Sequence, residues 1–324
     1  AIAGLVLVIV YAILAVSAPI LPIYSFRKVI ADHQDLPPSL QRSAGELWFD
    51  KTENYMGLVA KKEGRDSLSL EEIAALEEIR YKIETETMEY RGKIVKVHER
   101  RYLLGTDYLG RDMLARIIYG GQVSMAIGLI GTLVSFIIGT VLGSLAGYLG
   151  GKTDYIIMRI VDIMYGLPYM LLVIIFMAIL GRNILNLFFA LAIVSWLTVA
   201  RVVRGQIITL KNSEFVDAAR SMGASTPRIV FRHLVPNTLG IIIVFATLRV
   251  PAFIMLESFL SYLGLGVSAP YASWGSLVKE GVDAMTLYPW RLFFPALAMT
   301  IFLFAMNFLG DGLRDAFDPK SKNR

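Results

Sequence analysis

Four charged side chains lie inside long apolar stretches of this sequence, and they form two pairs. Arg159 and Asp162 are three residues apart, and Arg249 and Glu257 are eight residues apart with Pro251 between them. On a helix, the members of each pair share one face. A charge at the centre of a bilayer costs roughly 2.5–3.5 kcal/mol on insertion scales and usually marks function. Arg159 and Asp162 could pair near the cytoplasmic end of their apolar run, and Arg249 and Glu257 could either line a polar path or form an ion pair that holds helices together. The sequence leaves open whether the four charges line a pathway or are structural.

Few other residues indicate chemistry. The segment AGYLGGKT (residues 146–153) satisfies the loose phosphate-loop pattern with Ala in place of the first Gly, but an apolar helix precedes it instead of a strand. We interpret it as a glycine-rich turn and expect the chain to bind no nucleotide and no other cofactor. The chain has no Cys, and His33, His98 and His233 are too scattered in the sequence to suggest a metal site. With no nucleophile and base arrangement apparent, we expect no catalytic residues and no enzymatic activity.

The elements that carry these charges are predicted to be membrane helices. Of 324 residues, 55% are hydrophobic and 18% are charged, and the net charge of +5 is spread along the chain, so nucleic-acid binding is not expected. A helix needs about 20 apolar residues to cross about 30 Å of hydrocarbon. Six runs have this length: 2–21, 123–148, 155–180, 184–204, 238–260 and 291–312.

The backbone and the small residues of these runs define the fold class. Since an unpaired backbone amide in lipid costs several kcal/mol, the runs must be helices, and the sequence predicts an all-α polytopic membrane protein with six transmembrane helices. Small residues spaced by four in the second run predict close contact with neighbouring helices. They are Gly131, Ser135, Gly139, Gly143 and Gly147.

Basic residues in the short connections orient the spans. The links 149–159, 205–237 and 313–324 carry ten Lys and Arg residues, against two in 181–183 and 261–290. The first set is therefore predicted to be cytoplasmic, which places both termini inside. Because the chain begins with Ala in an apolar run, we expect a short cytoplasmic tail to precede this numbering, and we expect no cleaved signal peptide.

Residues 22–104 are composed like a soluble protein, and a domain of this length crosses the membrane largely regardless of its charge. In this domain, Ser69 and Glu72 form a capping-box pattern that predicts an amphipathic helix, whose acidic face is either solvated or a docking surface. The sequence thus predicts a first transmembrane helix (1–21), an extracytoplasmic domain (22–104), a short amphipathic helix in the outer interface of the membrane (105–122), a five-helix core (123–312) with a cytoplasmic loop (205–237), and a cytoplasmic tail (313–324).

The cytoplasmic loop contains a short polar stretch between long apolar runs, EFVDAARSMGAS (residues 214–225). Gly223 is placed to end a helix, and Ser225 is placed to cap the next one. Adjacent alanines leave a shallow surface that another protein can approach closely. The apolar face of the predicted helix consists of Phe215, Ala218, Ala219 and Met222.

With the residues that follow it, this stretch resembles the coupling loop of ABC importer permeases. The family pattern is Glu-Ala-Ala, three residues, Gly, nine residues, then Ile-x-Leu-Pro. This sequence has Asp in place of Glu, His233 in place of Ile and Val235 in place of Leu. The motifs GTDYLGRDMLARIIYGGQVS, MRIVDIMYGLPYMLL, LESFLSYLGLG and PYASWGSLVKEG extend the resemblance over about 105–318, to the C-type permease subunit of oligopeptide, dipeptide and nickel importers. The positions that match the coupling pattern are Asp217, Ala218, Ala219, Gly223 and Pro236.

The resemblance implies the fold of a type I ABC importer permease in the bacterial plasma (inner) membrane. A homologous second permease subunit would form the other half of the translocation pathway, and an extracytoplasmic solute-binding protein would deliver the cargo. Two cytoplasmic ATPase subunits, which hold ATP and Mg, would bind the helix around Asp217, Ala218, Ala219 and Gly223 and drive alternating access. Short peptides are the expected cargo, with nickel chelates or small oligosaccharides as the alternative. The resemblance implies nothing about residues 22–104 beyond a longer insertion than the family has.

Two other classes of protein remain open from the residues alone. A proton-coupled secondary transporter could use Asp162 and Glu257 as proton sites, although no inverted repeat is detectable. A membrane anchor could carry its function in residues 22–104, as a receptor or docking module. Deleting that domain while measuring uptake separates an anchor from a permease.

Overall fold

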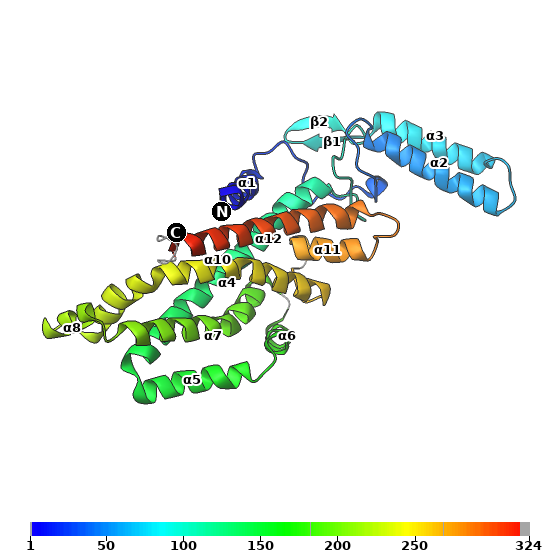
Figure 1. Cartoon of the computed structure of the whole chain (residues 1–324). Helices are drawn as coiled ribbons and strands as arrows, with labels where there is room; N and C mark the ends of the chain where they lie inside the picture. Colours follow the sequence, from blue (N-terminus) through cyan, green and yellow to red (C-terminus); the bar gives the residue numbers. More distant parts are fainter. Residues whose placement is uncertain (1, 182, 268, 318–324) are drawn as a thin grey trace. The chain divides into compact units, whose positions relative to one another are not determined.

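The computed structural model describes residues 2–181, 183–267 and 269–317 (Figure 1). Arg182 and most of the predicted C-terminal tail, residues 318–324, lie outside the described residues. The chain divides into two compact units, which we describe separately. The first consists of Ala1–Val16, Gly120–Lys279 and Leu297–Arg324, and the second of Ser17–Tyr119 and Glu280–Ala296.

Long apolar helices dominate the first unit, and shorter helices connect them. The longer ones are α1 (Ile2–Ser17), α4 (Met113–Leu149), α7 (Ile184–Leu210), α10 (Val235–Tyr262) and α12 (Trp290–Phe317). The shorter ones are α5 (Gly151–Tyr165), α6 (Tyr169–Leu180), α8 (Glu214–Ser221), α9 (Thr226–Arg228), the π-helical segment η2 (Ile229–Leu234) and α11 (Trp274–Val282).

Four helical stretches in the described residues are long and apolar enough to cross a membrane: Met113–Leu149, Leu185–Leu210, Thr226–Tyr262 and Trp290–Phe317. The pair α5 and α6 makes a fifth if it is counted as one bent span. Within the described residues, the apolar helix α1 covers 16 residues and ends at Ser17, because Pro19 disfavours helical backbone at Ala18. The predicted all-α, multi-span architecture is confirmed at four or five spans, whereas the predicted six are not all found as helices of spanning length.

The run 155–180 is not the single helix that the sequence predicts. Helix α5 ends at Tyr165, α6 begins at Tyr169, and their axes differ in direction by 88°. The cause is Pro168, which has no N–H to donate and whose ring disfavours helical backbone at Leu167. The chain therefore turns sharply here, and Tyr169 opens a new helix.

Helix α4 packs closely on its neighbours through glycines. A Cβ atom added to Gly139 would lie 2.5 Å from the Cβ of Val199, and one added to Gly143 would lie 2.5 Å from the carbonyl oxygen of Ala200. Both contacts are with α7. On the side facing α10, a Cβ atom added to Gly131 would lie 3.0 Å from the ring of Phe253, which is also a tight contact. The close contact predicted from the four-residue spacing is thus confirmed.

The second unit contains an antiparallel pair of helices and a β-hairpin. Helices α2 (Ala44–Lys62) and α3 (Leu70–Thr85) lie side by side (Figure 1), and β1 (Thr87–Tyr90) pairs with β2 (Lys93–Lys96). The capping box predicted at Ser69 and Glu72 is present at the start of α3, and a second one that was not predicted begins α2. A short 3₁₀ helix, η1 (Ala31–His33), precedes α2.

Residues 105–112 form a tight loop. Thr106 pairs with Asp112 in an isolated bridge, and the carboxylate of Asp107 accepts the backbone N–H of Arg111 at 2.9 Å. Helix α4 then runs without a break from Met113 to Leu149, so the separate short helix expected over 105–122 is not found. A Cβ atom added to Gly121 would lie 2.8 Å from the ring of Trp274 of α11, so the missing side chain lets this ring pack against the backbone of α4.

The second unit also brings two histidines together. Nε2 of His33 lies 2.9 Å from Nδ1 of His98, although 65 residues separate them in the sequence. Histidines that are scattered in the sequence thus lie together in the structure, because the helical hairpin and the β-hairpin bring the chain back to η1. Burial, assisted by the charges of His98 and Arg100, lowers the pKa of His33 to about 3, so its ring is neutral at physiological pH.

The glycine contacts of α4 generate a prediction. We expect Gly143→Ala to lower the unfolding free energy by about 1–3 kcal/mol, because the new methyl group would overlap the backbone of α7. The matched control is Gly205→Ala in α7, where a Cβ meets nothing within 4 Å. That change should be neutral or stabilising by up to about 1 kcal/mol. Thermal unfolding in detergent measures both, and equal midpoints for the two variants would contradict the packing.

Candidate functional site

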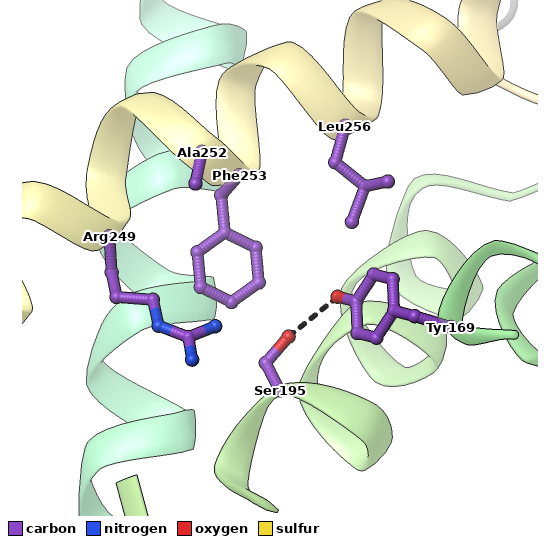
Figure 2. Close-up of a pocket in the computed structure, with 6 residues that line it drawn as sticks. All are labelled: Tyr169, Ser195, Arg249, Ala252, Phe253 and Leu256. Carbon is purple, nitrogen blue, oxygen red and sulfur yellow. Dashed lines mark hydrogen bonds between the residues drawn. The ribbon is translucent and has the colours of Figure 1, made fainter. Parts of the chain in front are cut away.

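A cavity of about 230 Å³ lies between α6, α7 and α10 in the first unit. Figure 2 shows Arg249 and Phe253 pointing from α10 toward a hydrogen-bonded pair formed by Tyr169 of α6 and Ser195 of α7. The wall is apolar apart from these three polar groups. The lining residues are Tyr169, Ser195, Arg249, Ala252, Phe253 and Leu256.

The broken span positions one side of this cavity. Tyr169 is the first residue of α6, directly after Pro168, so the 88° turn determines where its ring lies. The Ser195 hydroxyl donates to the carbonyl of Leu191 at 2.6 Å, which leaves its oxygen to accept from the Tyr169 hydroxyl at 2.8 Å. Both hydroxyl groups are thereby held in one arrangement, and their hydrogen bonds hold α6 beside α7.

Arg249 is the positive group of the cavity. Among the described residues its guanidinium has no ion pair and no hydrogen bond, and it also borders two smaller hollows, one beside Phe245 and one beside Tyr165. A guanidinium stays protonated at any physiological pH and presents a planar set of donors. A bound anionic group would satisfy this side chain through charge-assisted hydrogen bonds.

Glu257 lies outside this cavity. It is fully buried, and one carboxylate oxygen accepts hydrogen bonds from the hydroxyls of Ser261 and Ser273, both at 2.6 Å. The other oxygen has no partner within the described part of the chain. Eight helical residues correspond to about 12 Å along the axis. Accordingly, no ion pair joins Arg249 to Glu257 among the described residues, and Glu257 instead anchors the segment around Ser273 to α10.

The predicted pair of Arg159 with Asp162 is not formed. Asp162 accepts a hydrogen bond from Arg201 of α7 at 2.5 Å, and Arg159 lies over the ring of Tyr155. The reason is geometric, because α7 packs beside α5 and offers Arg201 to the carboxylate, while Tyr155 on the preceding turn of α5 occupies Arg159. The ion pair between Asp162 and Arg201 therefore ties the C-terminal end of α5 to α7.

A second ion pair between these helices was not predicted. Arg204 donates from two nitrogens to both carboxylate oxygens of Asp154. Asp154 lies in the first turn of α5, directly after the turn formed by Gly150 and Gly151, both of which have positive φ. The interpretation of the AGYLGGKT segment as a glycine-rich turn is therefore confirmed. In the sequence, the two glycines were the only sign of the turn that places the Asp154 carboxylate beside Arg204.

Helix α8 buries one face in its own chain and exposes the other. Val216 and Ala219 pack with Ile207, Ile229 and Leu234 of α7 and η2. The predicted apolar face is thus divided, because Phe215, Ala218 and Met222 are exposed while Ala219 is only 2% exposed. Val216 was not among the predicted residues, although its spacing of three from Ala219 places the two on one helix face.

The end of α8 agrees with the prediction. The helix stops at Ser221, and Gly223 has φ +80, a conformation in which most other residues are strained. Ser225 stands at the start of α9 as predicted, but its side chain makes no capping hydrogen bond. Pro236 lies in the first turn of α10, so α9, η2 and α10 follow one another without an intervening loop.

Comparison with known proteins identifies the class of molecule that contains this cavity. The family model described as binding-protein-dependent transport system inner membrane component matches residues 139–323, more than half of the chain. The chain belongs to this family. It is thus a multi-pass permease of the inner membrane and a transport subunit rather than an enzyme, and such permeases work with ATPase subunits and substrate-binding proteins.

Curated relatives of the permease narrow the family. The oligopeptide transport system permease protein OppC of Bacillus subtilis (strain 168) is 48% identical over 225 residues, which cover 69% of this chain and 74% of the relative. The dipeptide transport system permease protein DppC of the same organism is 48% identical over 217 residues, which cover 67% of this chain and 68% of the relative. This permease is therefore a member of the oligopeptide and dipeptide branch of ABC importer permeases.

A solved structure supports the fold. The permease matches the inward-facing methionine ABC transporter MetNI with a TM-score of 0.52 and 18% identity, over 64% of this chain and 98% of that one. At this identity the likeness bears on the fold alone. Both the cavity and α8 lie in the region that the family model matches.

The division of α8 into a buried and an exposed face can be tested with thiol labelling, since the permease has no native Cys. We expect Ala218→Cys to react with a water-soluble maleimide at least about ten times faster than Ala219→Cys, because only Ala218 is exposed. The two variants are adjacent and carry the same substitution. Equal labelling rates in the folded permease would show that α8 does not pack as described.

Proposed function

We propose that this permease forms half of the translocation pathway of an ATP-driven importer of short peptides. The curated relatives named for oligopeptide and dipeptide transport support the cargo class. The observation that carries the proposal is the cavity in which Arg249 is the one charged residue among the described lining residues, because a peptide ends in a carboxylate. A homologous second permease forms the other half of the pathway.

The path runs past Arg249, Tyr169 and Ser195. The guanidinium binds the C-terminal carboxylate of a passing peptide, and the apolar wall, which includes Phe253, accepts side chains without selecting among them. Since the site must also release its cargo, a wall with one charge-assisted contact, one pair of hydroxyls and otherwise apolar side chains suits transport better than a closed binding pocket. Glu257 is buried away from the path and serves as a structural anchor.

Coupling to ATP hydrolysis takes place at α8. Two cytoplasmic ATPase subunits, which bind ATP and Mg, contact the exposed face that includes Asp217, Ala218 and Gly223. The buried face of α8, which includes Ala219, packs on η2, and η2 continues past Pro236 into α10. A displacement of α8 is therefore passed along continuous helix to Arg249, which changes access to the cavity.

The chain crosses the membrane six times, with both termini in the cytoplasm. In this topology α1 crosses as a short span, α5 and α6 together make one broken span, and residues 22–104 lie outside. The excess of Lys and Arg in the links that include α8 supports this orientation. An extracytoplasmic solute-binding protein delivers the cargo to the outer side.

The alternative cargoes are nickel chelates and small oligosaccharides. A neutral oligosaccharide offers no charge to Arg249, so the unpaired guanidinium would remain unsatisfied in the path. The cation favours a cargo with a carboxylate, and the curated relatives favour peptides among such cargoes. Proton-coupled transport is less well supported, because Asp162 is paired with Arg201.

The coupling proposal predicts the effect of bulk at Gly223. In a reconstituted complex, we expect Gly223→Trp to abolish solute-stimulated ATPase activity, because the indole would hold the ATPase away from α8. A Cβ at this position meets nothing within 4 Å in the chain itself, so the permease should still fold. Gly223→Ala carries the same backbone strain without the bulk, and it should retain most of the activity. Normal stimulation of the Trp variant would contradict the proposal.

The path proposal predicts a dependence on the cargo carboxylate. We expect Arg249→Ala to lower uptake of a dipeptide about ten- to a hundredfold, which is the loss of one charge-assisted hydrogen-bonded contact of about 1.5–3 kcal/mol. Arg249→Lys should recover part of the uptake. For a C-terminally amidated dipeptide that the binding protein accepts, the Ala variant and the wild type should differ little. An equal loss for both peptides would assign Arg249 a structural role.

A further inference from the structure

Buried polar groups form a continuous chain in the second unit. The hydroxyl of Tyr102 lies 2.9 Å from Nδ1 of His33, and Nε2 of His33 lies 2.9 Å from Nδ1 of His98. Nε2 of His98 in turn lies 2.9 Å from a carboxylate oxygen of Glu86. A carboxylate oxygen of Asp32 completes a cluster in which one atom each of Asp32, Glu86 and His98 lie within 4.8 Å of one another.

The ring of His98 is held rigidly. Trp48 stacks on it with ring centroids 5.1 Å apart, and His33 meets it edge to face at 5.0 Å. Its backbone carbonyl accepts the N–H of Gly45 at 2.8 Å. The side chain is fully buried, so its outward nitrogen is aimed at one point, beside the carboxylate of Glu86.

The two carboxylates are less enclosed than the ring of His98. The N–H of Glu86 donates to Lys82 and its carbonyl accepts from Val97, while its side chain remains 48% exposed. Asp32 lies in the short helix η1 and is half-buried. Within the described residues, the carboxylate of Asp32 has no hydrogen-bond partner and no ion pair. Small rotations of these side chains can therefore close the cluster around an ion.

We propose that Asp32, Glu86 and His98 bind a divalent transition-metal ion, for which Zn²⁺ is the best fit. One imidazole nitrogen and two carboxylate oxygens are ligands that Zn²⁺ accepts at about 2.0–2.2 Å, and water takes the open position. Ca²⁺ and Mg²⁺ prefer an all-oxygen set, so the histidine favours zinc. The ion joins η1, the end of α3 and the segment after β2.

His33 and Tyr102 serve as the outer shell of this site. When the ion takes the Nε2 lone pair of His98, that ring carries its proton on Nδ1 and donates it to Nε2 of His33. His33 then donates from Nδ1 to the oxygen of Tyr102, so each ring keeps one proton and none is released. A hydrogen bond of this kind fixes the tautomer and orientation of a metal-binding histidine.

Zinc binding to the full chain tests the proposal. The permease is purified in detergent with a tag that contains no histidine and is stripped with a chelator, and Zn²⁺ affinity is then measured by competition with a chromophoric chelator. We expect one Zn²⁺ per chain in the wild type and at least about tenfold weaker binding in Asp32→Asn. The matched control is Asp66→Asn, which makes the same change at an exposed position between α2 and α3.

A second measurement separates a metal site from a hydrogen-bond network. Asp32→Asn leaves the bond between His98 and Glu86 intact, so without metal its unfolding midpoint should equal that of the wild type. Zinc should raise the midpoint of the wild type and of Asp66→Asn but not that of Asp32→Asn. The proposal is overturned if the wild type binds no Zn²⁺ at micromolar concentration, or if Asp32→Asn binds it as tightly as the control does.

Discussion

Close backbone contact between α4 and α7 is the constraint on which the first unit depends. Because Gly139 and Gly143 have no side chains, α7 can approach so near that a single methyl group would overlap it. In lipid, helices gain little from the hydrophobic effect when they associate, so dispersion contacts of this kind must supply the attraction. Helix α10 also packs on α4, at Gly131. Because α7 and α10 both pack on α4, Ser195 of α7 and Arg249 of α10 line the same cavity.

Two departures from regular helix determine how that cavity could open. Pro168 breaks the third span, and the chain restarts at Tyr169 on the cavity wall, so one wall is carried by a short helix with its own direction. On the other side, η2 continues into α10 without a loop. A π-helical segment is a wider and less stable turn, and such turns occur frequently at functional sites. The wall built on α10 is therefore connected to α8, whereas the wall built on α6 is not directly connected to it.

Much of this arrangement was predictable from the sequence, for identifiable reasons. Apolar runs, the glycine spacing of α4 and the capping box at Ser69 are local signals. The structure confirms the glycine spacing and the capping box, and it contains four of the six apolar runs as unbroken helices of spanning length. The ion pair between Arg201 and Asp162 joins residues far apart in the sequence, and nothing local indicated it. Pro168 is itself the local signal of the turn, but residues 155–180 are long and apolar enough for one span, so a single helix was predicted. Tyr169 could not be assigned to the cavity until that turn was known.

The four charged side chains in the apolar runs have different surroundings, and the difference bears on their roles. Asp162 meets a guanidinium at the exposed end of α5, and Glu257 is buried with two serine hydroxyls on one oxygen. The ion pair offsets the energetic cost of the Asp162 charge, whereas at Glu257 the two hydroxyls stabilise one carboxylate oxygen and the other has no partner within the described part of the chain. Arg249 has no such compensation among the described residues. A guanidinium without a partner on a cavity wall is available to an anionic group, which is the physical basis for the proposal that the cargo binds at Arg249.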